Sequence, residues 1–190
     1  MLITLDIETN TSHDNIWVVV TQDVETGEML EHYSAVTLAP LISQASGVIG
    51  HNIVGFDAPV LLKQWNLHIP TPKQRDTLVM SRLYNPPLEG GHSLDSWGKR
   101  FGDHKIDFHD YDGGLSDEMV EYCRQDVALT TRLYKHLTDT LKREGFSQQC
   151  VDLEEKVAII TAQQERNGFM LDVEQATLLW QDITHKMRQI

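Results

Sequence analysis

Two carboxylates near the N-terminus stand two positions apart, Asp6 and Glu8, within an alternating, β-branched stretch at 2–8. Side chains at positions i and i+2 of a strand leave the same face of a sheet, so we expect the two carboxylates side by side. Such a pair is costly unless a cation neutralises it, and Mg²⁺ and Mn²⁺ prefer oxygen ligands. Taken alone, an ordinary acidic strand face in solvent is the simpler explanation of the pair.

A third carboxylate, Asp57, follows a short apolar stretch at 47–51 and a loop of mostly small and apolar residues. It stands directly before a helix predicted at 58–65, which has Pro59 in its first turn, where proline is tolerated. Aspartate is also a favoured helix N-cap, and that role by itself explains Asp57.

Tyr122 and Asp126 are four positions apart on a helix predicted at 117–143, after the N-cap Ser116. They therefore share one face of the helix, apart from its apolar stripe. Aspartate is a poor helix former, and no lysine or arginine stands three or four positions from Asp126 to neutralise it. This favours a functional role for Asp126 over an ordinary solvated face.

The elements that must position these residues alternate along the chain. Hydrophobic period and turn residues predict strands at 2–8, 16–21, 29–36 and 47–51 and helices at 38–45, 58–65, 78–84, 94–101, 117–143, 151–167 and 173–190. The apolar stripe of the long helix consists of Met119, Cys123, Val127, Thr130, Tyr134 and Leu137. Strands come first, helices are interspersed among them and helices finish the chain, which predicts an α/β fold with a hairpin-bearing mixed sheet.

Composition sets outer bounds on function. The 190 residues suit one ordinary domain, or one with a short appendage, and the net charge of −12 argues against a high-affinity, non-specific nucleic-acid binder. No apolar run approaches the ~20 residues of a membrane span, and no secretory signal is recognised, so we expect no membrane partner. Cys123 and Cys150 form no CxxC pair, which predicts a reduced, cytoplasmic setting.

Other polar clusters give weaker signals. The acidic and histidine residues between 103 and 112 lack the spacing of a calcium loop, and we expect a solvated polar loop there. Asp76 is expected to have a structural role. The histidines show no HExxH pair, and no hydrolase or Walker-type glycine motif occurs.

The three carboxylate motifs are far more specific together than singly. Asp-x-Glu, then His-Asn-x-x-x-Phe-Asp, then Tyr-x-x-x-Asp on a late helix resembles the DEDD exonuclease superfamily, in its tyrosine-containing branch. The resemblance implies an RNase H-like fold, a mixed five-stranded sheet flanked by helices. It also implies the catalytic positions Asp6, Glu8, Asp57, Tyr122 and Asp126, of which the four carboxylates hold two Mg²⁺ or Mn²⁺ ions.

Residues 75–83, 92–102 and 163–169 further resemble the proofreading domain of family A DNA polymerases, closest to those of short-tailed, T-odd-type phages. This implies an exonuclease domain at 1–147 and a helical extension at 148–190 like the connection to a polymerase domain. The partner would be a DNA polymerase domain of the same chain or a separate polymerase subunit.

The expected activity is 3′→5′ hydrolysis of single-stranded or frayed DNA with release of nucleoside 5′-monophosphates, in a proofreading role. Thr9 and Asn10 are expected to offer backbone N–H groups to the terminal nucleotide, with Asn52 and Phe56 lining its pocket. Core packing explains Phe56 equally well. A ribonuclease that trims RNA 3′ ends and a non-catalytic module that docks on a polymerase remain alternatives.

Overall fold

The computed structural model describes residues 1–103 and 108–189. Its centre is a five-stranded sheet of order β3-β2-β1-β4-β5. The strands are β1 Leu2–Thr9, β2 Ile16–Asp23, β3 Met29–His32, β4 Gly47–Gly50 and β5 Gln74–Asp76. β2 runs antiparallel to both of its neighbours, β1 and β3, whereas β4 pairs in parallel with β1 and β5 in parallel with β4. The predicted mixed, five-stranded α/β sheet is therefore confirmed.

Seven α-helices and one 3₁₀ turn accompany the sheet in the described part of the chain. They are α1 Ala35–Gln44, α2 Asp57–Trp65, η1 Thr71–Lys73, α3 Thr77–Tyr84, α4 Leu94–Phe101, α5 Asp117–Arg143, α6 Gln148–Asn167 and α7 Val173–Met187. As predicted, Ser116 caps α5: its hydroxyl accepts a hydrogen bond from the backbone of Met119.

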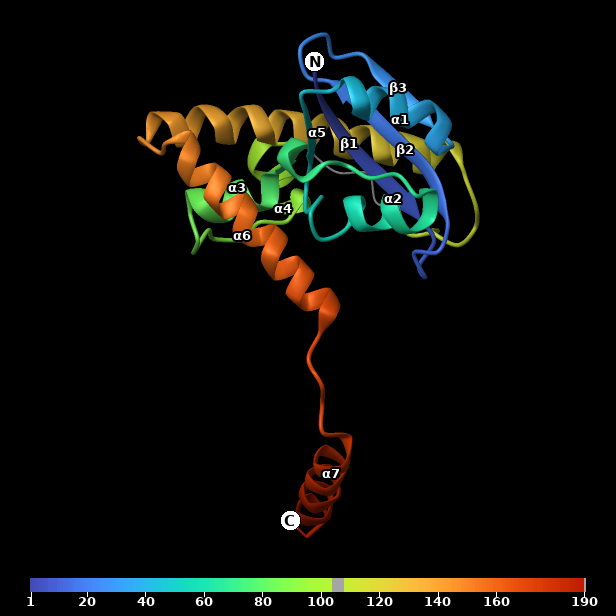
Figure 1. The fold of residues 1–190 in the computed structure, drawn as a ribbon, viewed down its shortest axis with the longest axis vertical. Helices are drawn as coiled ribbons and strands as arrows, with labels where there is room; N and C mark the ends of the chain where they lie inside the picture. Colours follow the sequence, from blue (N-terminus) through green and yellow to red (C-terminus); the bar gives the residue numbers. More distant parts are fainter. Residues whose placement is uncertain (104–107, 190) are drawn as a thin grey trace.

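The alternation of β1 sends its side chains to two different layers. Ile3, Leu5 and Ile7 are buried in a core cluster with residues of α1 and α2. The opposite face meets α5, where Thr131 donates a hydrogen bond of 2.8 Å to Thr4. Figure 1 shows α1 and α2 on one side of the sheet and α5 crossing behind it. The carboxylates of β1 consequently face the long helix that carries Tyr122 and Asp126.

Several predicted boundaries differ from the structure. The third strand ends at His32 rather than at 36, because the buried His32 ring bonds Thr21 across the sheet and Thr37 at the start of α1. α1 then begins at Ala35, three residues earlier than predicted. β5 was missed by the residue pattern, since its three residues are polar or charged and have no apolar alternation.

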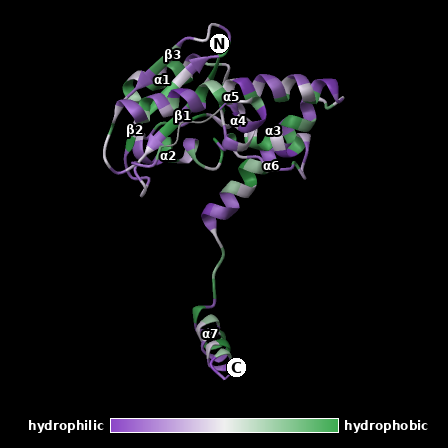
Figure 2. Ribbon diagram, turned by 180° about the vertical axis from the view of Figure 1, so that it is seen from behind, coloured by the Kyte–Doolittle hydropathy of each residue, from purple (hydrophilic) through white to green (hydrophobic). Residues whose placement is uncertain are grey.

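The C-terminal segment separates from the rest of the molecule after α6. α6 packs on the body through Val151, Glu155 and Ala162, whereas none of the described residues of α7 is buried. An extended stretch at 168–172 connects the two helices, and α7 stands apart in Figures 1 and 2 with hydrophobic side chains exposed. The predicted division after residue 147 stays a prediction. In the part of the chain that the structure describes, we find no helix that could span a membrane.

Candidate active site

The end of β1 and the N-terminal half of α5 line an open cavity of about 390 Å³. Its lining residues are Asp6, Ile7, Glu8, Thr9, Asn10, Thr11, His13, Phe56, Tyr111, Tyr122 and Asp126. Seven of the nine residues predicted from the sequence to form the site are therefore brought together here. The two that do not line the cavity are Asn52 and Asp57.

Asp6 and Glu8 share one side of β1, as predicted, and face the buried thiol of Cys123. One potential ligand atom from each of these three residues lies within 4.8 Å of the others. The thiol donates to Asp6, 3.5 Å from its backbone oxygen and 3.7 Å from Oδ2. Burial, and then the neighbouring carboxylates, raise the pKa of Cys123 well above its usual value, so this group is a neutral thiol. The oxygen atoms are the hard ligands of the cluster.

Asp126 and Tyr122 reach the same cavity from α5. Asp126 is only 5% exposed. Burial raises the pKa of Tyr122, and Asp126, Tyr111 and Glu8 raise it further, which places the phenol among these groups. Tyr122 and Asp126 line the cavity, whereas Cys123 and Val127 of the apolar stripe pack against Val18 and Val20 of β2. The alternative of an ordinary solvated face does not hold for Asp126, because this residue is buried.

Asp57 is the first residue of α2 rather than its N-cap, which is Phe56, so the N-cap alternative was wrong. Its carboxyl is 2% exposed and interacts with the backbone of Ile7, between the two carboxylates of β1. Burial raises the pKa of Asp57 to about 7, with a smaller contribution from the charge of Asp76. Among the described residues, its Oδ1 atom has no hydrogen-bond partner. A buried carboxyl with a spare oxygen beside Ile7 is suited to a cation.

Asp76 has the structural role predicted for it. The side chain is 1% exposed and accepts backbone hydrogen bonds from Asn52, Val54 and Leu78 at 2.9, 3.2 and 2.9 Å. It therefore caps α3 and fixes the turn that leads from β4 to α2. Asn52 lies in that turn with a positive φ of 67°, and the structure places its side chain outside the cavity. Its position serves the turn that orients Asp57.

Four cavity residues were missed by sequence analysis: Ile7, which stands between the two carboxylates of β1, and Thr11, His13 and Tyr111. His13 has a left-handed φ of 54°, bonds Thr9 Oγ1 at 2.9 Å and lies edge-on to Phe56 at 4.9 Å. The polar run that follows the first motif was the available signal for Thr11 and His13. No pattern in the sequence indicated Tyr111, because only tertiary contacts bring this residue to the site.

The loop that carries Tyr111 is more than the solvated polar loop predicted between residues 103 and 112. Phe108 is buried, and Asp112 accepts hydrogen bonds from both the backbone and the hydroxyl of Thr11. His104 and Asp107 of the same predicted loop lie outside the described residues. The described part of this loop forms a wall of the cavity.

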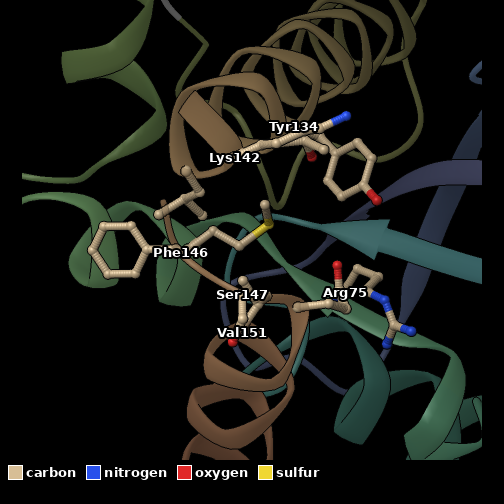
Figure 3. Close-up of a pocket in the computed structure, with 10 residues that line it drawn as sticks. Arg75, Tyr134, Lys142, Phe146, Ser147 and Val151 are labelled. Atoms are coloured by element: carbon tan, nitrogen blue, oxygen red, sulfur yellow. The ribbon is translucent and has the colours of Figure 1, made fainter. Parts of the chain in front are cut away.

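A second cavity, of about 230 Å³, lies where the end of α5 meets the start of α6. Figure 3 shows Tyr134 and Lys142 along one side and Ser147 and Val151 along the other. The described residues that line it include no carboxylate, and Met80, Leu141 and Phe146 make much of it apolar. Of these two cavities, only the one between β1 and α5 is lined by carboxylates.

Comparison with known proteins agrees with this geometry. A 3′–5′ exonuclease family model matches residues 3–142. The DNA-directed DNA polymerase of Escherichia phage T7 is 26% identical over 204 residues, in an alignment that covers 78% of this chain and 29% of the polymerase. The chain thus spans less than a third of that relative's length.

Solved structures share the fold at lower sequence identity. NrnC of Brucella melitensis with bound Mg²⁺ has a TM-score of 0.68 at 22% identity, covering 88% of this chain and 86% of that one. The catalytic core of RRP6 from Trypanosoma brucei has a TM-score of 0.63 at 17% identity, covering 83% and 46%. The predicted RNase H-like exonuclease fold is confirmed.

Proposed function

The chain belongs to the 3′–5′ exonuclease family of the DNA polymerase A type, and on that premise we propose that it removes nucleotides from the 3′ end of DNA by metal-dependent hydrolysis. The observation that carries the proposal is the meeting of Asp6, Glu8, Asp126 and Tyr122 in one cavity, with Asp57 buried beside Ile7. Sequence-distant acidic groups gathered this closely are costly without a cation.

The donor set fits a hard divalent cation. Four carboxylates would hold the ions: Asp6, Glu8, Asp57 and Asp126. All are oxygen donors, which suits Mg²⁺ or Mn²⁺, and the spare oxygen of Asp57 is one available ligand atom. Two such ions supply activation of a water molecule and neutralisation of the charge that develops on the phosphate.

Tyr122 acts on the water rather than on the nucleic acid. Its phenol stays protonated, because burial and the neighbouring carboxylates raise its pKa, so it orients water by hydrogen bonding and is not a free base. The water oxygen attacks the terminal phosphorus and the bond from phosphorus to the 3′ oxygen breaks. The departing 3′ oxygen takes up a proton, and the products are a nucleoside 5′-monophosphate and a strand shorter by one nucleotide.

The same cavity also offers groups for the terminal nucleotide. Thr9 and Asn10 continue directly from the carboxylate strand, and Phe56 lines the cavity beside His13. Phe56 would stack on a base, and His13 and Asn10 would contact the sugar or phosphate. Only an unpaired end can enter, which favours single-stranded or frayed DNA, where unpairing costs little.

A proofreading role would require a polymerase near the site. The T7 relative is named as a DNA polymerase, and this chain corresponds to less than a third of it. We propose that the chain works with a DNA polymerase domain or subunit. The apolar side chains exposed on 168–187 provide surface for that contact.

A cleavage assay tests the proposed activity. Purified chain is incubated with single-stranded DNA or RNA labelled at the 5′ end, with Mg²⁺, Mn²⁺ or chelator. We expect metal-dependent shortening of DNA from the 3′ end, and loss of this activity in Asp6→Asn and Asp126→Asn. Asp139→Asn, which changes an exposed carboxylate of α5, is the matched control.

Each other outcome has a definite meaning. Faster cleavage of RNA would replace DNA by RNA as the substrate. Full activity in Asp6→Asn would refute the site. Inactivity with both metals would favour the docking module, and copurification with a polymerase chain would then identify its partner.

A further inference from the structure

A groove of about 520 Å³ is lined by residues of α2, of the loop that follows it and of the second half of α6. Much of its lining is apolar and includes Val54, Ala58, Ile69 and Ile159. The described residues that line it include no carboxylate, although the chain has 28 acidic residues against 16 lysines and arginines. The groove is therefore a place where a strongly acidic chain presents no negative charge.

Three basic side chains also line the groove: Lys63, His68 and Arg166, all of them exposed. In the part of the chain that the structure describes, neither Lys63 nor Arg166 forms an ion pair with a carboxylate. Arg166 donates instead to the neutral amide of Gln163, at 3.2 Å. Exposed cations beside an apolar surface match single-stranded nucleic acid, which has anionic phosphates and apolar base faces.

The groove continues from the candidate active site along α2. Phe56 lines the active-site cavity, and Pro59 and Lys63 line the groove; the three follow one another at steps of three and four residues and so share one side of the helix. Seven helical residues span roughly 10 Å. Gln64, next to Lys63, donates from Nε2 to the backbone oxygen of His13 at 2.7 Å, and His13 lines the cavity. A strand whose 3′ end lies in the cavity can therefore reach the groove with its next few nucleotides.

We propose that the groove between α2 and α6 binds the single strand of the substrate upstream of its 3′ end, with Lys63 and Arg166 contacting phosphates and the apolar lining contacting bases and sugars. The proposal rests on the function proposed above and adds a binding site to it. Such a site supplies local positive charge in a chain whose net charge of −12 opposes nucleic-acid binding. An acidic segment of a polymerase is the competing occupant, and the continuity of the groove with the active-site cavity favours the strand.

Binding of oligodeoxythymidine labelled at the 5′ end, measured by fluorescence anisotropy with the full chain in chelator, tests the proposal without cleavage. We expect Lys63→Gln and Arg166→Gln each to weaken binding of a strand of about ten nucleotides by about fivefold. In the double variant, the slope of log K against log salt concentration should become less steep by about 1.4, because each phosphate contact to a single strand contributes about 0.7. A dinucleotide should show no such loss, because it ends before the groove.

The matched control is Lys135→Gln, which removes an exposed cation from α5 and should bind the longer strand as the wild type does. Lys63 and Arg166 also stand in the last turns of their helices, where a cation stabilises the helix dipole. That role alone would lower the melting temperature without weakening binding, so the melting temperature of each variant is measured as well.

Several results would overturn the proposal. They are equal affinity of the wild type and the double variant for the longer strand, an equal loss for the dinucleotide, and a wild type that binds the longer strand no better than the dinucleotide. A lower melting temperature with wild-type affinity would assign both cations to their helix ends instead. Wild-type DNA binding in a double variant that no longer copurifies with a polymerase would make the groove a protein interface.

The outcome for the groove is separate from the outcome for the proposed chemistry. A chain that binds the strand through Lys63 and Arg166 but cleaves it with neither Mg²⁺ nor Mn²⁺ refutes the proposed function and keeps the binding site. A chain that cleaves the dinucleotide and the longer strand with equal kcat/KM keeps the proposed function and refutes the groove.

Discussion

The thiol of Cys123 on α5 donates to Asp6 on β1, 3.5 Å from the backbone oxygen and 3.7 Å from Oδ2 of the same residue. The neutral, fully buried thiol of Cys123 thus lies directly against the Asp6 carboxylate. The sheet and the long helix meet at this contact, and it fixes the distance between the first and third sequence motifs.

Cys123 should not be a metal ligand, because its hydrogen is already donated to Asp6 and hard cations prefer oxygen. We expect Cys123→Ser to keep metal binding and activity, with a stability loss of about 1 kcal/mol. Co²⁺-loaded wild-type protein should show no thiolate-to-metal charge-transfer absorption. A strong absorption that disappears in Cys123→Ser, but persists in Cys150→Ser, would contradict this prediction.

Asp6→Asn should separate stability from activity. In chelator, removal of one carboxylate relieves repulsion within the cluster, so we expect a higher melting temperature than that of the wild type. Exonuclease activity should fall by at least about 100-fold, because the variant loses the negative charge of a proposed metal ligand and no longer orients the cation. Mn²⁺ should stabilise the wild type against heat but not this variant. Equal stabilisation of both would place the cation elsewhere.

Glu155 should make stability depend on pH. The residue is 5% exposed, and burial raises its pKa to about 7 although Arg75 lies 3.2 Å away and opposes the shift. A carboxyl whose pKa is raised on folding contributes stability that is complete below its unfolded value of 4.5 and is lost as pH rises through about 7. Glu155→Gln should therefore unfold with a weaker pH dependence and be more stable than wild type above pH 7.

The gain in the free energy of unfolding of Glu155→Gln over the wild type above pH 7 should be at most roughly 3 kcal/mol, because the size of the pKa shift limits it. Urea denaturation at several pH values between 4 and 8 measures it. Glu154→Gln, at an exposed neighbouring position of α6, should retain the wild-type pH profile. A Glu155→Gln profile that parallels the wild type across this range would contradict the prediction.

Asp76→Ala should be among the most destabilising single changes in the body of the protein. It leaves the backbone N–H groups of Asn52, Val54 and Leu78 without their acceptor, which we expect to cost about 2–4 kcal/mol in the free energy of unfolding. Activity should also fall, because the same turn orients Asp57. The exposed Asp95→Ala should cost less than about 0.5 kcal/mol in the same urea titration.

Removal of residues 168–190 should leave the body intact. None of the described residues of α7 is buried, and Phe169 and Met170 are each 97% exposed, so the free energy of unfolding loses no packing. We expect an unchanged melting temperature and a lower tendency to self-associate, measured by calorimetry and light scattering. A fall of several degrees would show that this segment packs on the body in solution.

Some features followed from local pattern alone. The long helix begins at Asp117 and ends at Arg143, as its capping serine and its apolar period predict, because these signals act within a few residues. The same holds for the i, i+2 geometry of Asp6 and Glu8. β5 was not predictable in this way, since its place in the sheet comes from parallel pairing with β4 and not from its own residues.

The sequence by itself singled out the carboxylates that we propose carry the chemistry, their order, and the helix and strand that hold most of them, because motif spacing and secondary-structure period are properties of neighbouring residues. Only the tertiary structure decided how they meet. It placed Asp57 beside the backbone of Ile7, kept Asn52 in a turn outside the cavity and brought Tyr111 next to Tyr122. These relations depend on hydrogen bonds and packing between segments far apart in the chain, which no local pattern encodes.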